Sequence, residues 1–194
     1  SHTAIATVAA VLAAGAVPVL VDIDPIFYTL DVAALEGAIT ANTRAIVPVH
    51  IYGQPAQLDA IRHFATTRGL AIIEDCAQAT GGLFAGKRVG SFGDVGCFSF
   101  YPTKNLGAIG DGGMVVTNSK NVADKLRELR QYGWDAERRP QCVGVNSRLD
   151  SLQAAILAAK LTALDADNAR RIEIARRYQD GLRDMPIILP QTRA

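Results

Sequence analysis

Short apolar runs alternate with helix-length segments over the first two-thirds of the chain, and this alternation is the strongest constraint on the fold. The runs at 17–21, 45–49 and 70–74 are rich in Val, Ile and Leu, and helical patterns lie between them. Strands separated by helices of this length are typical of right-handed crossovers and of a parallel sheet covered on both faces. The sequence therefore predicts an α/β fold with a mainly parallel sheet flanked by helices.

The pattern changes in the last third of the chain. Two β segments, 95–100 and 113–117, are separated only by a Gly-rich loop, and Ser119 is placed to cap a following helix. From Asn146 onward, apolar residues keep helical spacing, and an Arg-rich helix follows over about 168–182. We expect these helices to lead away from the sheet towards a second domain.

Charge and cysteine content narrow the class of function. Lys and Arg number 20 and Asp and Glu 19, so the net charge is +1, which disfavours nucleic-acid or anionic-membrane partners and favours a small molecule. The cysteines Cys76, Cys97 and Cys142 form no CxxC pair and have no metal-ligand spacing, which predicts a reduced, cytoplasmic protein without a metal. The apolar stretch 4–21 is broken by Gly15 and Pro18, so no membrane span or signal peptide is expected.

Two clusters of polar residues follow predicted strands, where open α/β sheets bind their ligands. The first is the segment 74–78, in which Glu74 and Asp75 end a strand whose preceding residues are apolar. An acid at this point could equally cap the next segment, and Gln78 could be its first-turn partner.

The second cluster is 98–113, which carries Lys104 in a compact turn after Pro102. A lone loop lysine is usually a solvated charge, and glycine-rich turns are usually ordinary turns. This lysine follows aromatic residues and precedes several glycines that let backbone approach a ligand closely.

Together the two clusters suggest pyridoxal-phosphate chemistry. A Schiff-base lysine needs a partly desolvated pocket, because burial lowers its pKa and frees the amine. Pyridoxal phosphate also needs a carboxylate opposite its ring nitrogen, and Asp75 could supply it, while Ser99 offers a hydroxyl to the phosphate. From spacing alone, this interpretation is one of several.

Several segments, in order, resemble the DegT/DnrJ/EryC1/StrS family of sugar aminotransferases. They are 1–7 (SHTAIAT), 48–55 (PVHIYGQP), 73–79 (IEDCAQA), 97–108 (CFSFYPTKNLGA), 110–113 (GDGG) and 146–150 (NSRLD). The resemblance covers nearly the whole chain. It implies the fold-type-I large domain of pyridoxal-phosphate enzymes.

The resemblance implies a role for five residues. Lys104 would bind the cofactor covalently and act as the acid/base, Asp75 would pair with the pyridinium nitrogen, and Gln78 would contact the ring or its 3-hydroxyl. Ser99 would bind the phosphate, and Asn146 would reach the phosphate in the neighbouring subunit's site. The implied assembly is a homodimer with shared active sites.

The implied reaction is transfer of an amino group from an amino acid donor, usually glutamate, to a nucleotide-linked keto-sugar. The form of the segment 110–113 leans towards a 3-keto sugar. By the same resemblance, residues 1–145 would be the cofactor-binding domain without its N-terminal part, and 146–194 the helical connection and start of a small C-terminal domain. Both ends of the chain look cut, as in a fragment.

Three alternative functions and the roles of three residues stay open. A sugar dehydratase of this family would carry His in place of Lys104, a regulator or sensor would use the same fold without catalysis, and a cysteine desulfurase would need a cysteine on a mobile loop. His2 could compensate for Ala4, where relatives carry an aromatic residue, or be only a loop residue. His50, at a strand end, could act in the pocket or make a structural hydrogen bond, and Arg148 could bind an anion or a subunit partner.

Overall fold

The computed structural model describes residues 2–192. Ser1, which begins the opening motif, and Arg193 and Ala194, which end the predicted 146–194 segment, lie outside the described residues. The elements of the main sheet are β1 (Ala45–Ile46), β2 (Ala71–Asp75), β5 (Val95–Ser99) and β6 (Gly113–Val116). A separate hairpin is formed by β3 (Leu83–Phe84) and β4 (Lys87–Arg88).

The main sheet is mixed but mostly parallel. Its strand order is β1-β2-β5-β6, with β1, β2 and β5 parallel and β6 antiparallel to β5. The loop between β5 and β6 contains no helix and turns the chain back on itself, so β6 pairs antiparallel. The predicted α/β architecture with a mainly parallel sheet flanked by helices is confirmed.

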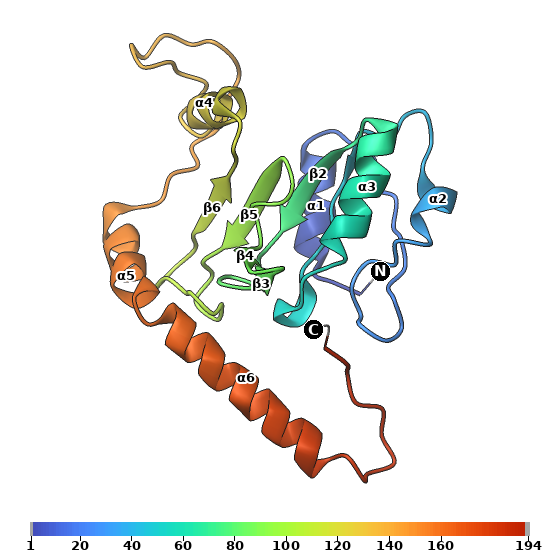
Figure 1. Cartoon of the computed structure of the whole chain (residues 1–194). Coiled ribbons are helices and arrows are strands. Elements are labelled where there is room, and N and C mark those ends of the chain that lie inside the picture. The colour runs from blue at the N-terminus through green and yellow to red at the C-terminus, as the bar shows by residue number, and fades with distance from the viewer. Residues whose placement is uncertain (1, 193–194) are drawn as a thin grey trace.

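The helices lie in two groups around this sheet (Figure 1). The first group is found beside β1 and β2 and consists of α1 (Ile5–Ala13), α2 (Leu35–Ala38) and α3 (Leu58–Arg68), with the short 3-10 helix η1 (Ile51–Gly53). The second group comprises α4 (Lys120–Leu129), α5 (Ser151–Leu161) and α6 (Leu164–Gly181) and follows the β5–β6 side.

Local sequence signals explain the ends of two helices. Gly69 adopts the left-handed conformation that ends α3, at φ +65°. Ser119 caps α4 as predicted, because its side chain accepts a hydrogen bond from the Val122 N–H.

The prediction of a buried strand at 17–21 is wrong. This segment is extended but forms no ladder with any described strand, and Val17, Val19 and Leu20 are more than half exposed. An apolar run becomes a strand only where a neighbouring strand supplies hydrogen-bond partners, and β1 pairs only with β2 within residues 2–192.

Strand β2 presents different chemistry to its two faces. Ile72 and Glu74 are buried on one face, where Ile72 packs with Ile61 and Ala65 of α3. Because side chains alternate along a strand, Asp75 points to the opposite face. Two adjacent acidic residues are thereby placed in separate environments.

Glu74 is fully buried and accepts four hydrogen bonds. Its carboxylate receives Nε2–H of His50 at 3.0 Å and the backbone N–H groups of Gly90, Phe92 and Gly93 at 2.6–2.8 Å. Burial raises the pKa of Glu74, but these hydrogen bonds outweigh burial and hold the pKa below its ordinary value of 4.5. Glu74 is therefore a charged carboxylate that connects strand β2 with the loop that precedes β5.

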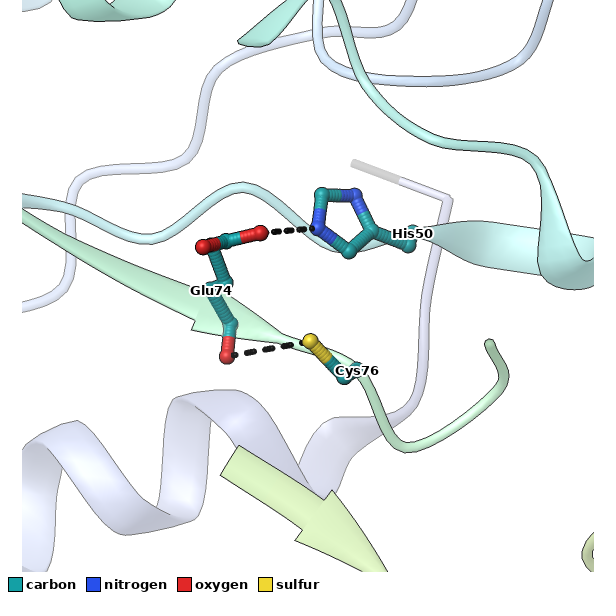
Figure 2. Close-up of side chains that lie close together, drawn as sticks. All are labelled: His50, Glu74 and Cys76. Atoms are coloured by element: carbon teal, nitrogen blue, oxygen red, sulfur yellow. Dashed lines mark hydrogen bonds and ion pairs between the residues drawn. The ribbon is translucent and has the colours of Figure 1, made fainter. Parts of the chain in front are cut away.

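His50 completes this network, as Figure 2 shows. Its Nδ1 accepts the Ala56 N–H at 3.1 Å, so Nε2 must carry the ring proton that is donated to Glu74. The His50 backbone N–H also donates to the Asp75 carbonyl. The histidine is held as a single tautomer and has a structural hydrogen bond, one of the two roles left open for it.

Replacing Glu74 by Gln tests this network. The amide oxygen can accept some of the N–H groups, but its NH₂ group faces further donors, so we expect the free energy of unfolding to fall by about 3 kcal/mol. A carboxylate whose pKa is lower in the folded than in the unfolded protein stabilises the fold at pH values above its unfolded pKa, and this stabilisation is lost as the pH falls. The difference in the free energy of unfolding between wild type and Glu74→Gln should therefore shrink below pH 4.5.

The measurement is urea unfolding as a function of pH, with Glu36→Gln as the matched control. Glu36 is 70% exposed and pairs with Arg68, so its replacement should cost less than about 1 kcal/mol. Equal losses for the two variants would contradict the role given to Glu74.

Candidate active site

The carboxyl ends of β2 and β5 bring the predicted site segments to one edge of the sheet. These strands are parallel neighbours, and their register pairs Asp75 with Cys97. Ser99 ends β5 two residues later, and the turn carrying Lys104 follows. Strand ends of this kind are where open α/β sheets bind ligands.

Asp75 is held by groups from two segments. Its Oδ2 accepts the hydroxyl of Thr7 at 2.7 Å, and its Oδ1 accepts the Ala77 N–H at 3.0 Å. The backbone of Asp75 exchanges hydrogen bonds with Pro48 and His50. The carboxylate is half-buried and kept in one orientation.

Thr7 was missed by the sequence analysis. It lies in α1, sixty-eight residues before Asp75, and its neighbourhood is a run of small and apolar residues. Helical spacing shows which residues share a face with Thr7 but not which strand that face meets. Only the tertiary structure identifies it as a partner of Asp75.

The Lys104 turn is compact and stabilised by backbone hydrogen bonds. The Lys104 N–H donates to the Tyr101 carbonyl at 2.9 Å, and the Ala108 N–H donates to the Phe100 carbonyl at 2.8 Å. Gly107 is required here, because a Cβ at this residue would lie 2.4 Å from the Pro102 carbonyl oxygen. The turn therefore has one tightly defined shape.

The side chain of Lys104 is half-buried. Within residues 2–192, no hydrogen bond or ion pair involves its amine. Ser99 is also half-buried, and its Oγ accepts the Tyr101 N–H at 3.3 Å, which leaves its own proton available to another acceptor.

The Lys104 turn rests on helices from the last third of the chain. Leu157 of α5 and Leu164 of α6 form a buried cluster with Phe100, Leu106 and Ala108. The side chain of Lys160 in α5 also donates to the Gly107 carbonyl. These contacts from α5 and α6 stabilise the turn and do not involve the Lys104 side chain.

The other two predicted site residues are exposed. Gln78 is exposed in the turn after β2. Asn146 is exposed in the loop between α4 and α5, where it pairs with Gln131 and accepts Nε–H of Arg148 at 2.8 Å. In the described part of the chain, neither side chain is hydrogen-bonded to the Asp75 or Lys104 segments.

His2 lies at the opening of the chain among aromatic residues. Its Nε2 is hydrogen-bonded to the Tyr52 hydroxyl, and its ring centroid lies 6.2 Å from that of Tyr28. Both tyrosines have positive φ, at 58° and 59°. Strain of this kind persists only where surrounding contacts impose it.

His50, Glu74 and Cys76 place potential metal ligands within 4.8 Å of one another. Both ring nitrogens of His50 and both oxygens of Glu74 are already engaged, as described above. Burial, followed by the charges of Glu74 and Asp75, raises the pKa of the Cys76 thiol far above its ordinary value, so the thiolate that a metal needs is disfavoured. The geometry fits a structural cluster.

Burial also raises the pKa of Cys97, and the charge of Asp75 adds to this effect. A nucleophilic cysteine needs a lowered pKa and access to solvent. Cys76 is buried, Cys97 is half-buried and neither has a lowered pKa, so neither is suited to act as a nucleophile.

Among the helices of residues 2–192, none combines the length and apolar character needed to cross a membrane.

Comparison with known proteins places this chain in a family. A sequence profile of the DegT/DnrJ/EryC1/StrS aminotransferase family matches residues 1–194. The erythromycin biosynthesis sensory transduction protein EryC1 of Saccharopolyspora erythraea is 52% identical over 193 residues, which cover 99% of this chain and 53% of that protein. A UDP-N-acetyl-3-dehydro-alpha-D-glucosamine 3-aminotransferase of Acidithiobacillus ferrooxidans is 50% identical over 194 residues, covering 100% and 53%.

The fold matches a solved structure equally well. DesV of S. venezuelae, determined in complex with a ketimine intermediate, superposes with a TM-score of 0.96 at 49% identity, covering 100% of this chain and 52% of that one. The chain thus spans about half the length of the relatives it matches. On sequence and fold together, the chain belongs to the DegT/DnrJ/EryC1/StrS aminotransferase family.

Proposed function

We propose that the protein carrying this chain is a pyridoxal-phosphate-dependent aminotransferase that acts on a nucleotide-linked keto-sugar. The observation that carries the proposal is the grouping of Asp75, Ser99 and Lys104 at the carboxyl ends of two adjacent parallel strands, where Asp75 and Ser99 end the strands and Lys104 lies in the turn that follows. The 3-aminotransferase of Acidithiobacillus ferrooxidans, at 50% identity, supports the lean towards a 3-keto sugar. The amino donor would be an amino acid, with glutamate expected.

The residues present fit pyridoxal phosphate chemically. A half-buried lysine amine without a described protein partner is suited to a covalent bond with an aldehyde. Asp75 is a carboxylate with fixed orientation, and Ser99 has a hydroxyl proton to donate. When bound, the cofactor supplies the electron sink that amino-group transfer requires.

Each residue would then have a defined task. Lys104 would bind the cofactor and carry the proton between carbon atoms, acting as general acid and base. Asp75 would hold a proton on the ring nitrogen, and Thr7 would keep the Asp75 carboxylate in position. Ser99 would donate to the phosphate, and Gln78, exposed after β2, would contact the ring.

The predicted assembly and domain organisation belong to the same proposal. Residues 1–145 would form the cofactor-binding domain, and 146–194 the connection to a small domain. Asn146 lies on an exposed loop, outside the hydrogen-bonded group around Asp75 and Lys104. This position suits a residue that completes a neighbouring subunit's site in a homodimer.

A second candidate is a regulatory protein that uses this fold without catalysis. The name of EryC1, which is 52% identical, describes a sensory transduction protein and favours this candidate. The complete Lys104, Asp75 and Ser99 set favours catalysis. The dehydratase alternative is disfavoured because Lys104 is lysine and not histidine.

The first test replaces Lys104 with Ala and uses Lys87→Ala as the matched control. We expect wild type and Lys87→Ala to bind pyridoxal phosphate covalently, with visible absorbance that borohydride fixes to the protein. Lys104→Ala should lose this adduct and at least about a thousandfold of the transfer activity, because both the covalent bond and the acid/base group are removed.

Absorbance spectra, peptide mapping after borohydride and glutamate-dependent amination of 3-keto and 4-keto nucleotide sugars give the readouts. A wild-type protein that binds no cofactor would overturn the proposal. Binding at Lys104 without transfer to any sugar in the panel would favour the regulatory candidate.

The second test removes the hydrogen bond between Thr7 and Asp75. Thr7→Val keeps the side-chain shape but has no hydroxyl, so the Asp75 carboxylate loses one fixing contact. We expect the Kd for pyridoxal phosphate to rise roughly tenfold, which corresponds to one hydrogen bond to a charged group. The measurement is an absorbance titration of the cofactor-free protein.

Thr7→Ser retains the hydroxyl and is the control. Its Kd should stay within about threefold of wild type, since the donor is preserved. Equal affinities for Thr7→Val and wild type would refute a role for Thr7 in holding Asp75.

A further inference from the structure

Asn168 of α6 is hydrogen-bonded to the two loops that carry the proposed site. Its Oδ1 accepts Nδ2–H of Asn105 at 2.9 Å, and its Nδ2 donates to the Thr80 carbonyl at 3.0 Å. Asn105 directly follows Lys104, and Thr80 lies in the loop that begins at Asp75. One half-buried side chain therefore links the lysine loop to the carboxylate loop.

The orientation of this amide is determined by its partners. Arg171 lies one turn along α6 and donates from Nη1 to Asn168 at 3.2 Å. A guanidinium can only donate and the Thr80 carbonyl can only accept, so the oxygen of Asn168 must face Arg171 and its NH₂ group must face Thr80. The same oxygen then faces the Asn105 NH₂ group, and all three bonds are satisfied together.

The Thr80–Gly81 turn is shaped to receive Asn168. Gly81 has φ +86°, and a Cβ at this residue would lie 2.6 Å from Asn168 Nδ2 and 3.2 Å from Leu164 Cδ2. A side chain at Gly81 would displace the Asn168 amide from the turn, and the positive φ would strain any residue with a Cβ there. Leu164 is itself part of the buried cluster beneath the Lys104 turn, so Asn168 sits where the helix is firmly packed.

We propose that Asn168 is a positioning residue that sets the distance between Lys104 and Asp75. This inference rests on the proposed function. Catalysis by a bound cofactor requires the lysine on one side and the carboxylate on the other to hold a defined separation, and small displacements of such groups are costly. Strands β2 and β5 fix the start of each loop, while Asn168 joins the loops beyond the strand ends.

Two substitutions separate the contacts of Asn168. Asn168→Asp keeps an acceptor for Asn105 and Arg171 but places a second acceptor against the Thr80 carbonyl, so only the link to the carboxylate loop is lost. Asn168→Leu loses both links. Asn105→Ser breaks the link to the lysine loop without altering α6, which provides a variant for use if a substitution in the helix impairs folding.

Glu173→Gln is the matched control. Glu173 lies further along the same helix and pairs with Arg170 at 2.6 Å and Arg177 at 2.5 Å, which are both exposed residues of α6. Its replacement removes surface ion pairs within the helix and should leave the site loops unchanged.

The experiment has one readout without cofactor and two with it. Hydrogen exchange of cofactor-free protein reports the mobility of segments 76–82 and 101–109. The absorbance of bound pyridoxal phosphate, titrated with pH, reports the surroundings of the Lys104 nitrogen. Steady-state kinetics separate kcat from KM.

We expect Asn168→Asp and Asn168→Leu to speed exchange in the loops they release and to shift the pH midpoint of the absorbance. They should lower kcat by roughly ten- to a hundredfold while KM changes by less than about threefold, because positioning of the reacting groups is lost and not sugar binding. Asn105→Ser should reproduce the effects on the lysine loop, and Glu173→Gln should change none of them.

The inference fails if Asn168→Leu leaves loop exchange, the pH midpoint and kcat as in wild type, or if Glu173→Gln produces the same changes. If the Asn168 variants yield less folded protein but the folded fraction keeps the wild-type pH midpoint of the absorbance, Asn168 has a purely structural role and the inference is also refuted. Absence of cofactor absorbance in wild type would instead be a failure of the proposed function, and the exchange experiment would still decide whether Asn168 couples the two loops.

Discussion

The parallel register of β2 and β5 is the constraint on which the rest of the site depends. In this register Asp75 pairs with Cys97, so the turn that carries Lys104 begins at the same edge of the sheet as the loop that follows Asp75. A slip of one residue would exchange the faces of Glu74 and Asp75, burying the wrong acid. The hydrogen bonds that Glu74 accepts from His50 and from the loop at 90–93 oppose such a slip, because they exist only with Glu74 turned inward.

Two neighbouring acids thus serve different purposes. Glu74 has every oxygen occupied by protein donors and acts as a buried connection between β2, His50 and the loop before β5. Within residues 2–192, the Asp75 side chain accepts hydrogen bonds from the Thr7 hydroxyl and the Ala77 N–H, and it remains half-buried at the sheet edge. Glu74 holds the strand in place, and Asp75 is the acid that the proposed function assigns to the cofactor.

The helices of the last third matter as much to this site as the sheet does. Leu157 and Leu164 pack beneath the Lys104 turn, and Lys160 caps the Gly107 carbonyl. Asn168 then connects that turn to the loop after Asp75. In Figure 1, α5 lies on the β5–β6 side, and α6 starts next to α5 and then extends below the sheet. Its first turns contact the site loops, while the rest of the helix is mostly exposed.

The sequence by itself determined the α/β class, the strands that carry Asp75 and Ser99, the helix cap at Ser119, and the family to which the chain belongs. Periodicity, capping residues and ordered motifs are local properties of the chain. The sequence could not show that 17–21 lacks a pairing strand, that Thr7 meets Asp75, or that Asn168 joins two loops. Those facts depend on which segments, distant along the chain, come within hydrogen-bond reach. Only the tertiary structure decides that, because a local pattern specifies the face a side chain occupies and not the partner that face will meet.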